Sequence, residues 1–253
     1  MGLDLQKASM WKRISAFLFD FILLGIVSVL VAWGLSALVG YDGYSRIVAD
    51  SYEKYGAEYG VNLKMTYSEY EALTEEEARR VDEAFAALNA DAKALRANQM
   101  MLQLSVLIVS LSLFLSHLTM EFLIPLKIGD GQTLGKKIFG IGLMKQDHVK
   151  VGAVQLFIRA ILGKYTIETM IPVLILMMVF WGTIGVVGPA VIGLILLVEV
   201  LVLIFTPTNA LIHDLLAGTV AVDQASQRIF DTADALIAYK KERHAEDAAR
   251  REY

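Results

Sequence analysis

The sequence contains no cysteine and only four histidines, and this narrows the chemistry open to the chain. Without cysteine there is no disulfide bond, no thiolate metal site and no cysteine nucleophile. The segment after Gly129 lacks the Gly-x-x-x-x-Gly-Lys-Ser/Thr order of a phosphate-binding loop, and no Gly-x-Ser-x-Gly elbow of a serine hydrolase is present. The net charge of −4 does not point to nucleic acid. We therefore expect no enzyme, no cofactor and no nucleic-acid partner.

Hydrophobic residues are in excess instead, at 56% of the chain with a mean hydropathy of +0.52. This is too apolar for an ordinary soluble domain. A membrane-spanning helix needs about 20 apolar residues. Glycine and proline between Gly182 and Pro189 divide the last apolar run into two crossings, with one crossing and a re-entrant segment as the alternative. The expected spans are Ile14–Val39, Met100–Pro125, Tyr165–Ile184 and Pro189–Phe205.

Lysine and arginine near the spans predict the orientation, because these residues are enriched in cytoplasmic loops. They are concentrated before the first span, in residues 127–164 and in the tail after Phe205, and four spans place all three segments on one side. The first span follows basic residues, as a signal peptide does. It is longer than a signal sequence and lacks an Ala-x-Ala cleavage pattern, so we interpret it as a retained anchor. Both termini are therefore expected in the cytoplasm.

The fold class that follows is all-α: a polytopic membrane helical bundle with four transmembrane helices, an outer helical insertion and a cytoplasmic C-terminal helix. Residues 1–40 hold the cytoplasmic N-terminus and the first span, and residues 41–99 form the extracytoplasmic insertion. Residues 100–223 hold the remaining three spans, with a cytoplasmic amphipathic loop at 127–164. Residues 224–253 form a charged cytoplasmic helix.

The insertion contains a helix start signal, because Thr74 followed by Glu77 matches a capping box. Apolar residues then recur at helical spacing, which predicts an amphipathic helix from about Glu75 that continues into the second span. Seven tyrosines lie between Tyr41 and Tyr70. They favour packing and anchoring at lipid headgroups, with a docking surface for a ligand or partner as the alternative.

The loop after the second span predicts a short helix at the membrane surface, capped by residues 131–133. Its basic residues Lys136 and Lys137 would meet anionic headgroups. Its apolar residues would enter the lipid; these are Leu134, Ile138, Phe139 and Ile141. Phosphate binding by a soluble ligand is the alternative.

Ionisable residues inside the spans are the most informative feature, since an acid at the centre of a membrane helix costs roughly 2.5–3.5 kcal/mol. Such a residue must be paired, hydrated or protonated. Asp20 and Arg13 are seven residues apart in the first span, too far for a direct ion pair in most rotamers. We expect each to meet a partner on another helix, with Asp214 and Arg159 as candidates.

A second polar group is expected around His117 and Glu121, which lie four residues apart and share a helix face. With Glu199 they can form a proton or cation site, or a structural pair that fixes helix packing. His-x-x-x-Glu supplies only two ligands, so no metal site is expected. The full intramembrane polar network and candidate ion pathway comprises Arg13, Asp20, His117, Glu121, Arg159, Glu199, His213 and Asp214.

Taken together, these residues resemble the RDD family of bacterial membrane proteins, named for one arginine and two aspartates. The resemblance rests on Arg13-x-x-Ala16-x-x-x-Asp20, Gly131-Gln-Thr-Leu-Gly135-Lys-Lys-Ile-Phe-Gly140, Gln155-Leu-x-x-Arg159 and His213-Asp214-Leu-Leu-Ala-Gly218-Thr219, in the family's order. It implies that Arg13, Asp20 and Asp214 are the naming residues and that Glu121 is the acid before the Gly-Gln-Thr segment. The insertion of residues 41–99 and the spacer after Glu121 are longer than the family pattern.

The resemblance implies the bacterial plasma membrane as the location and leaves two functions open. In the first hypothesis the chain is a homo-oligomer that exchanges monovalent cations for protons. Asp20 and Glu121 would bind proton and cation in turn, with Arg13 tuning their acidity. The alternative is a non-transporting accessory or scaffold protein in the lipid bilayer, which binds a membrane partner protein through residues 41–99 and the C-terminal tail.

Overall fold

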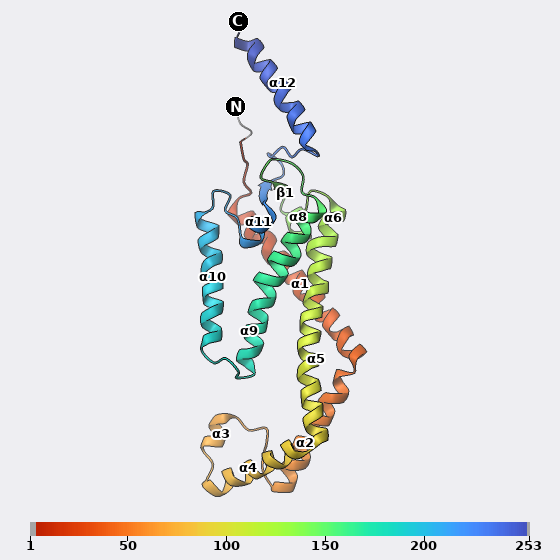
Figure 1. The fold of residues 1–253 in the computed structure, drawn as a ribbon, viewed down its shortest axis with the longest axis vertical. Coiled ribbons are helices and arrows are strands. Elements are labelled where there is room, and N and C mark those ends of the chain that lie inside the picture. Colours follow the sequence, from red (N-terminus) through yellow and green to blue (C-terminus); the bar gives the residue numbers. More distant parts are fainter. Residues whose placement is uncertain (1–3, 252–253) are drawn as a thin grey trace. The chain divides into compact units, whose positions relative to one another are not determined.

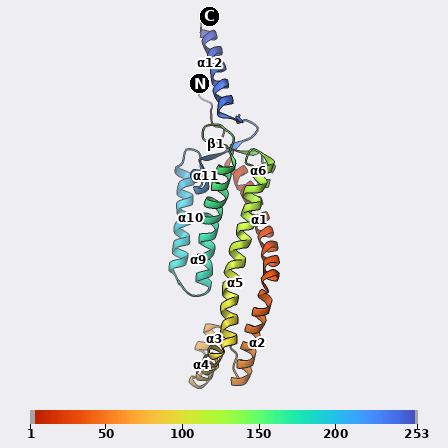
Figure 2. The same cartoon turned by 45° about the vertical axis from the view of Figure 1, so that its right-hand side comes forward.

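A computed structural model describes residues 4–251 of the chain. Four helical stretches are long and apolar enough to cross a membrane, which confirms the all-α class with four spans. They are α1 (Met10–Val39); α5 (Ala92–His117) continued by the π-helix η1 (Leu118–Leu123) and α6 (Ile124–Ile128); α8 (Ala153–Phe157) continued by the π-helix η2 (Ile158–Met170) and α9 (Ile171–Phe180); and α10 (Val187–Phe205). A short turn joins α9 to α10, and these two helices lie side by side (Figure 1, Figure 2).

The third span begins at Ala153, well before the predicted start at Tyr165. The charges of Arg159 and Lys164 favoured a loop over residues 127–164, but the helix continues through both as η2. Each of the two side chains forms an ion pair with an acid on another element. Because pairing offsets the cost of a charge in a span, hydropathy alone places this boundary too late.

The chain divides into two compact units. Residues 29–112 form the insertion unit, which contains α2 (Tyr41–Tyr59), α3 (Tyr67–Glu71) and α4 (Glu75–Ala90). Thr74 and Glu77 form the expected capping box at the start of α4. The core of the unit consists of Leu63, Val81, Ala84, Leu88 and Ala94, with Tyr52, Tyr55, Tyr59 and Tyr70 packed against it.

The prediction that the insertion helix runs straight into the second span is wrong. The backbone turns out of the helix at Asp91, whose ψ is 104°. The Asp91 carboxylate accepts hydrogen bonds from the backbone N–H groups of Lys93 and Ala94 at 2.9 and 3.2 Å. An aspartate in this geometry is an N-cap, so it ends α4 and starts α5 as a separate helix.

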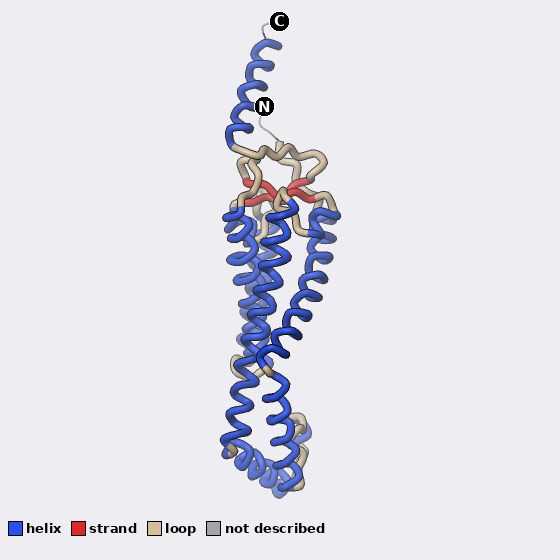
Figure 3. Tube along the Cα trace, turned by 90° about the vertical axis from the view of Figure 1, so that its right-hand side faces the viewer, coloured by secondary structure: helices blue, strands red, loops and turns tan. Residues whose placement is uncertain are grey.

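The remaining residues, 4–28 and 113–251, form the sheet unit. Its strands β1 (Ile141–Lys145) and β2 (Thr219–Asp223) pair antiparallel, with Leu143 opposite Ala221. Figure 3 shows both strands in red beside the ends of the helices. The unit also contains α7 (Leu134–Ile138), α11 (Ile212–Ala217) and α12 (Ala233–Arg251), the charged helix expected near the C-terminus.

The sheet was not predicted, and it corrects the expected position of Ile141. This residue was placed in a lipid-facing helix, whereas it lies in β1 and is buried. Both strands are only five residues long and almost entirely buried, so neither shows the alternation of apolar and polar residues that identifies a strand in a sequence.

Candidate functional site

The centre of the sheet unit is a buried ion pair between Arg159 on η2 and Asp214 on α11. Arg159 Nε lies 2.9 Å from Asp214 Oδ1, and both side chains are buried. The Thr219 hydroxyl donates to the same oxygen at 3.0 Å, and Arg13 on α1 lies 3.8 Å from Oδ2. The expectation that Arg13 finds a partner on another helix is met by Asp214. Side chains from three other elements, η2, β2 and α1, thus converge on this carboxylate of α11.

A glycine allows η2 and α11 to come this close. A Cβ atom built on Gly163 would lie 2.5 Å from His213 Cβ and 2.7 Å from His213 Cα. Carbon atoms in contact are normally about 3.5–4.0 Å apart. Gly163 is therefore required for the approach that places His213 and Asp214 beside Arg159.

The charges around Asp214 explain why it stays ionised although it is buried. Burial alone would raise the pKa of Asp214, but the paired guanidinium of Arg159 holds this pKa well below its usual range. Burial lowers the pKa of His213, in spite of the nearby carboxylates. His213 is therefore neutral at neutral pH.

The hydrogen bonds of His213 determine its tautomer. Arg159 can only donate, so the His213 Nε2 that lies 2.8 Å from Arg159 is the acceptor. Nδ1 then carries the hydrogen and donates to Glu168, whose two oxygens lie at 2.7 and 2.8 Å. The backbone N–H of His213 also donates to Glu168 Oε1 at 3.0 Å. Two donors from α11 thus hold the Glu168 carboxylate in place.

A second carboxyl group, that of Glu199 on α10, lies beside Glu168. Glu199 Oε2 accepts a 3.4 Å hydrogen bond from the backbone N–H of Ile212. Glu199 Oε1 is buried and has no hydrogen-bond partner among the described residues. Glu168 was not predicted as a member of this network, although an acid inside the predicted span Tyr165–Ile184 is a signal that identifies such a residue.

The expected group of His117, Glu121 and Glu199 is divided between different partners. Glu121 on η1 pairs with Lys164 on η2 at 2.6 Å, and its other oxygen is buried without a partner among the described residues. His117 Nδ1 lies 2.8 Å from the Leu113 carbonyl and Nε2 lies 3.2 Å from the Thr169 hydroxyl. Lys164 was read as a loop residue, which is why its pairing with Glu121 was not predicted.

Asp20 has partners other than the candidates expected from the sequence. Its oxygens accept hydrogen bonds from the Thr133 hydroxyl at 2.5 Å and from the Gly135 backbone N–H at 2.7 Å. A Cβ atom on Gly135 would lie 2.4 Å from the Ala16 carbonyl oxygen. The missing side chain lets the first turn of α7 approach α1, and the Thr133 hydroxyl and the Gly135 N–H replace the expected arginine as partners of Asp20.

The two lysines of α7 have different environments. Thr133 caps this helix, as predicted, by accepting from the backbone N–H of Lys136 at 3.3 Å. Lys137 is exposed, but Lys136 is buried, so the expectation that both meet lipid headgroups is wrong for Lys136. The close packing of α7 against α1 turns Lys136 into the protein interior.

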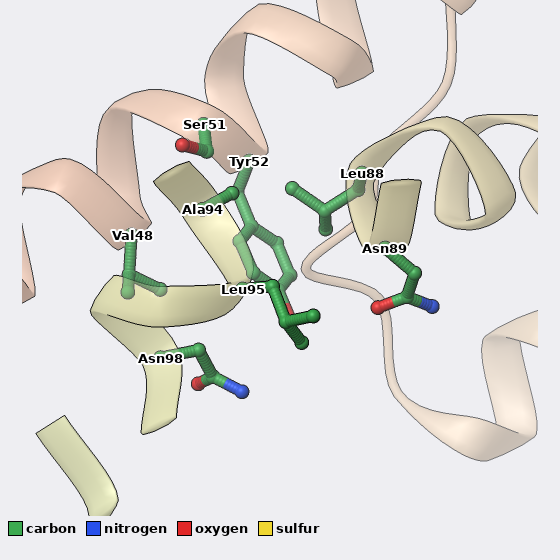
Figure 4. A pocket seen from close by; sticks show the side chains of 8 residues that line it. All are labelled: Val48, Ser51, Tyr52, Leu88, Asn89, Ala94, Leu95 and Asn98. Atoms are coloured by element: carbon green, nitrogen blue, oxygen red, sulfur yellow. The ribbon is translucent and has the colours of Figure 1, made fainter. Parts of the chain in front are cut away.

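Outside this polar network, the described residues include a small cleft and no candidate metal site. No group of three or more histidine and acidic residues within residues 4–251 could hold a metal ion. The insertion unit contains a small cleft between α2, α4 and α5, into which the Tyr52 ring points (Figure 4). Its lining comprises Val48, Ser51, Tyr52, Leu88, Asn89, Ala94, Leu95 and Asn98.

Comparison with known proteins identifies a family for this chain. The sequence model of the RDD family matches residues 7–218, a range that covers most of the chain and includes all the charged residues of the buried network. No curated protein and no solved structure matches the chain.

Proposed function

Because the chain belongs to the RDD family, we propose that it exchanges a monovalent cation for a proton across the membrane, at the Glu168–Glu199 pair. The observation that carries this proposal is the position of two acids side by side within spans, one of them with a buried oxygen that lacks a partner among the described residues. Like charges repel strongly where the effective dielectric constant is low. A proton or a small cation between the two carboxyl groups relieves this repulsion.

The pair suits exchange because the same oxygens serve both ligands. A proton on either carboxyl group removes one negative charge, and a monovalent cation between the two groups offsets the same charge. Binding of one therefore weakens binding of the other, which is the coupling that an exchanger needs. His213 fixes Glu168 with two hydrogen bonds, whereas the backbone N–H of Ile212 holds Glu199 by a longer bond of 3.4 Å, so Glu199 is the more adjustable member.

The other buried acids support the fold around this pair. Asp20 accepts from Thr133 and Gly135, Asp214 pairs with Arg159, and Glu121 pairs with Lys164. Each of these acids is already bound to a donor or a cation, so the proposed exchange site is the Glu168–Glu199 pair and not Asp20 and Glu121.

A homo-oligomer is part of the same proposal. Between 6% and 28% of each span is buried inside the chain, so most of the span surface is free to contact lipid or a second copy. Four helices from one chain are few to enclose an ion path across the membrane. A second copy would supply further helices around this path, while both carboxyl groups of the Glu168–Glu199 pair come from one chain.

The proposal is tested by sodium-driven proton flux in proteoliposomes loaded with a pH-sensitive dye. Wild-type protein should move protons when a sodium or other alkali-cation gradient is imposed. Glu199→Gln and Glu168→Gln should lose this flux, and Glu199→Asp should keep part of it. Glu246→Gln, which changes an exposed acid of α12, is the matched control and should behave as wild type. No flux from the wild type with any alkali cation would overturn the proposal.

The cleft of the insertion unit favours a second candidate function, that of an accessory protein. Under this alternative a membrane partner protein binds through α2, α4 and α5, where Asn89 and Asn98 offer hydrogen bonds. Replacing both asparagines by alanine should release a partner that co-purifies from native membranes, without changing the thermal unfolding of the chain. Retention of that partner by the double variant would contradict this alternative.

A further inference from the structure

Lys136 on α7 is a buried lysine that neither the fold nor the proposed exchange explains. Its side chain is 8% exposed, and its Nζ atom has no hydrogen-bond partner within residues 4–251. A charged ammonium group carries three N–H donors, and a protein interior penalises such donors when they are unsatisfied. The group therefore needs either a small ligand or a neutral state.

The cations that face Lys136 make a permanent charge at Nζ less favourable still. Arg159 and Lys164, both on η2, lie close enough to repel it. Each is already bound to an acid, Arg159 to Asp214 and Lys164 to Glu121. Lys136 is thus a third positive group in a region that holds two completed ion pairs.

The acids that face Lys136 do not pair with it directly. They are Glu121 on η1 and Asp214 on α11. On α1, which packs against the same helix, the Asp20 carboxylate is bound to Thr133 and Gly135. Glu121 Oε2, however, is the other atom of this region that is buried without a hydrogen-bond partner among the described residues.

A buried donor and a buried acceptor therefore lie within electrostatic range of each other, and no direct hydrogen bond or ion pair joins them. We propose that a water molecule bridges Lys136 Nζ and Glu121 Oε2, and that the Lys136 amine takes up an exchangeable proton through this water. Water is the smallest molecule that can accept from the first group and donate to the second. This site is separate from the Glu168–Glu199 pair, and the inference does not depend on cation exchange.

The proposed step is a proton transfer without any redox change. The lone pair of the neutral amine accepts a proton from the bridging water, and the water regains a proton from the medium. The new ammonium group then donates to the water and attracts Glu121, in competition with Lys164. Uptake of the proton thereby loosens the Lys164–Glu121 pair, and its release restores that pair.

The electrostatic surroundings support this site. Burial lowers the pKa of Lys136 well below its usual range, and Arg159 and Lys164 lower it further, while Glu121 and Asp214 act in the opposite direction. An unperturbed lysine titrates near pH 10.4, outside the physiological range. The lowered pKa brings proton uptake by Lys136 toward the range in which a membrane protein works.

Proton binding can be measured directly by potentiometric titration of the full chain, purified in detergent, between about pH 5 and about pH 9. Wild-type protein should bind about one proton per chain more than Lys136→Met over this range. The matched control is Lys137→Met, which removes the exposed neighbour on the same helix and should leave proton binding in this range unchanged. If circular dichroism shows that Lys136→Met does not fold, Lys136→Gln replaces it, since its amide can still bond to water.

A second comparison tests the bridge to Glu121. Glu121→Gln should bind about one proton per chain more than the double variant Glu121→Gln/Lys136→Met. The midpoint of this proton uptake should lie at lower pH than in the wild type, because the negative charge of Glu121 no longer stabilises the ammonium form of Lys136. Equal proton binding by wild type and a folded Lys136 variant would overturn the proposal. An unchanged midpoint in the Glu121→Gln background would overturn the bridge. Neither measurement uses a sodium gradient, so the result is independent of the flux experiment.

Discussion

The close approach of η2 to α11 at Gly163 and His213 leads to a quantitative prediction for Gly163→Ala. The new Cβ would lie 2.5 Å from His213 Cβ and 2.7 Å from its Cα, about 1 Å closer than carbon atoms in contact. The clash involves the backbone of α11 and cannot be relieved by rotating a side chain. Overpacking of this kind costs about 1–3 kcal/mol. It also moves Asp214 away from Arg159, which weakens the central ion pair.

The measurement is the thermal unfolding midpoint of the purified protein in detergent. A loss of stability shifts Tm by roughly 2–4 °C per kcal/mol in a chain of this size. The control is Gly193→Ala on α10, where the added Cβ meets nothing within 4 Å. An alanine inside a helix is favoured over glycine by about 0.5–1 kcal/mol, so Tm of the control should stay level or rise. Equal Tm values for the two variants would refute the reasoning about the contact.

Three further predictions follow from individual contacts. Thr133→Val keeps the shape of the side chain but removes the hydroxyl that donates to buried Asp20, so unfolding should become easier by about 1–3 kcal/mol; an unchanged Tm would show that this hydrogen bond is dispensable. Asp91→Ala removes the N-cap of α5 and should cost about 1 kcal/mol, measurable as faster amide hydrogen exchange around residues 92–95 and contradicted by unchanged exchange there. The pKa of Asp214 lies below that of an unfolded aspartate, about 3.9, so its stabilisation is complete above that pH and is lost as the pH falls further. The Tm difference between wild type and Asp214→Asn should therefore shrink below about pH 4, and a constant difference would contradict the pKa argument.

Much of the helical architecture could be predicted, because apolar runs and capping signals are local properties of the sequence. The four spans, the turn near Gly182 and the capping box at Thr74 all depend on residues close to one another in the chain. The break at Asp91 failed as a prediction because the helical spacing of apolar residues continues across it. The sheet was not predicted because the paired residues of its two strands are 74 to 82 positions apart in the sequence.

The sequence predicted many of the buried polar residues, but only a few of the pairs that they form. Acids inside apolar runs identified Asp20, Glu121 and Glu199, since such residues must be paired or protonated in a span. The pairs depend on which helices pack together. The absence of a side chain lets α7 approach α1 at Gly135 and lets α11 approach η2 at Gly163, and hydropathy does not predict either contact. The contacts of Lys164 and Glu168 were not predicted because hydropathy indicated a loop around Lys164 and the start of a span around Glu168, whereas both lie within η2 (Ile158–Met170).

Competition between a proton and a cation at the Glu168–Glu199 pair can be measured most directly on the purified protein in weakly buffered detergent solution. Addition of sodium chloride should release protons from the wild type, and a pH electrode records their number. Glu199→Gln should release none of these protons, while Glu246→Gln should match the wild type. If the wild type releases no protons with any alkali cation, or if Glu199→Gln releases as many, the pair is not the site of exchange.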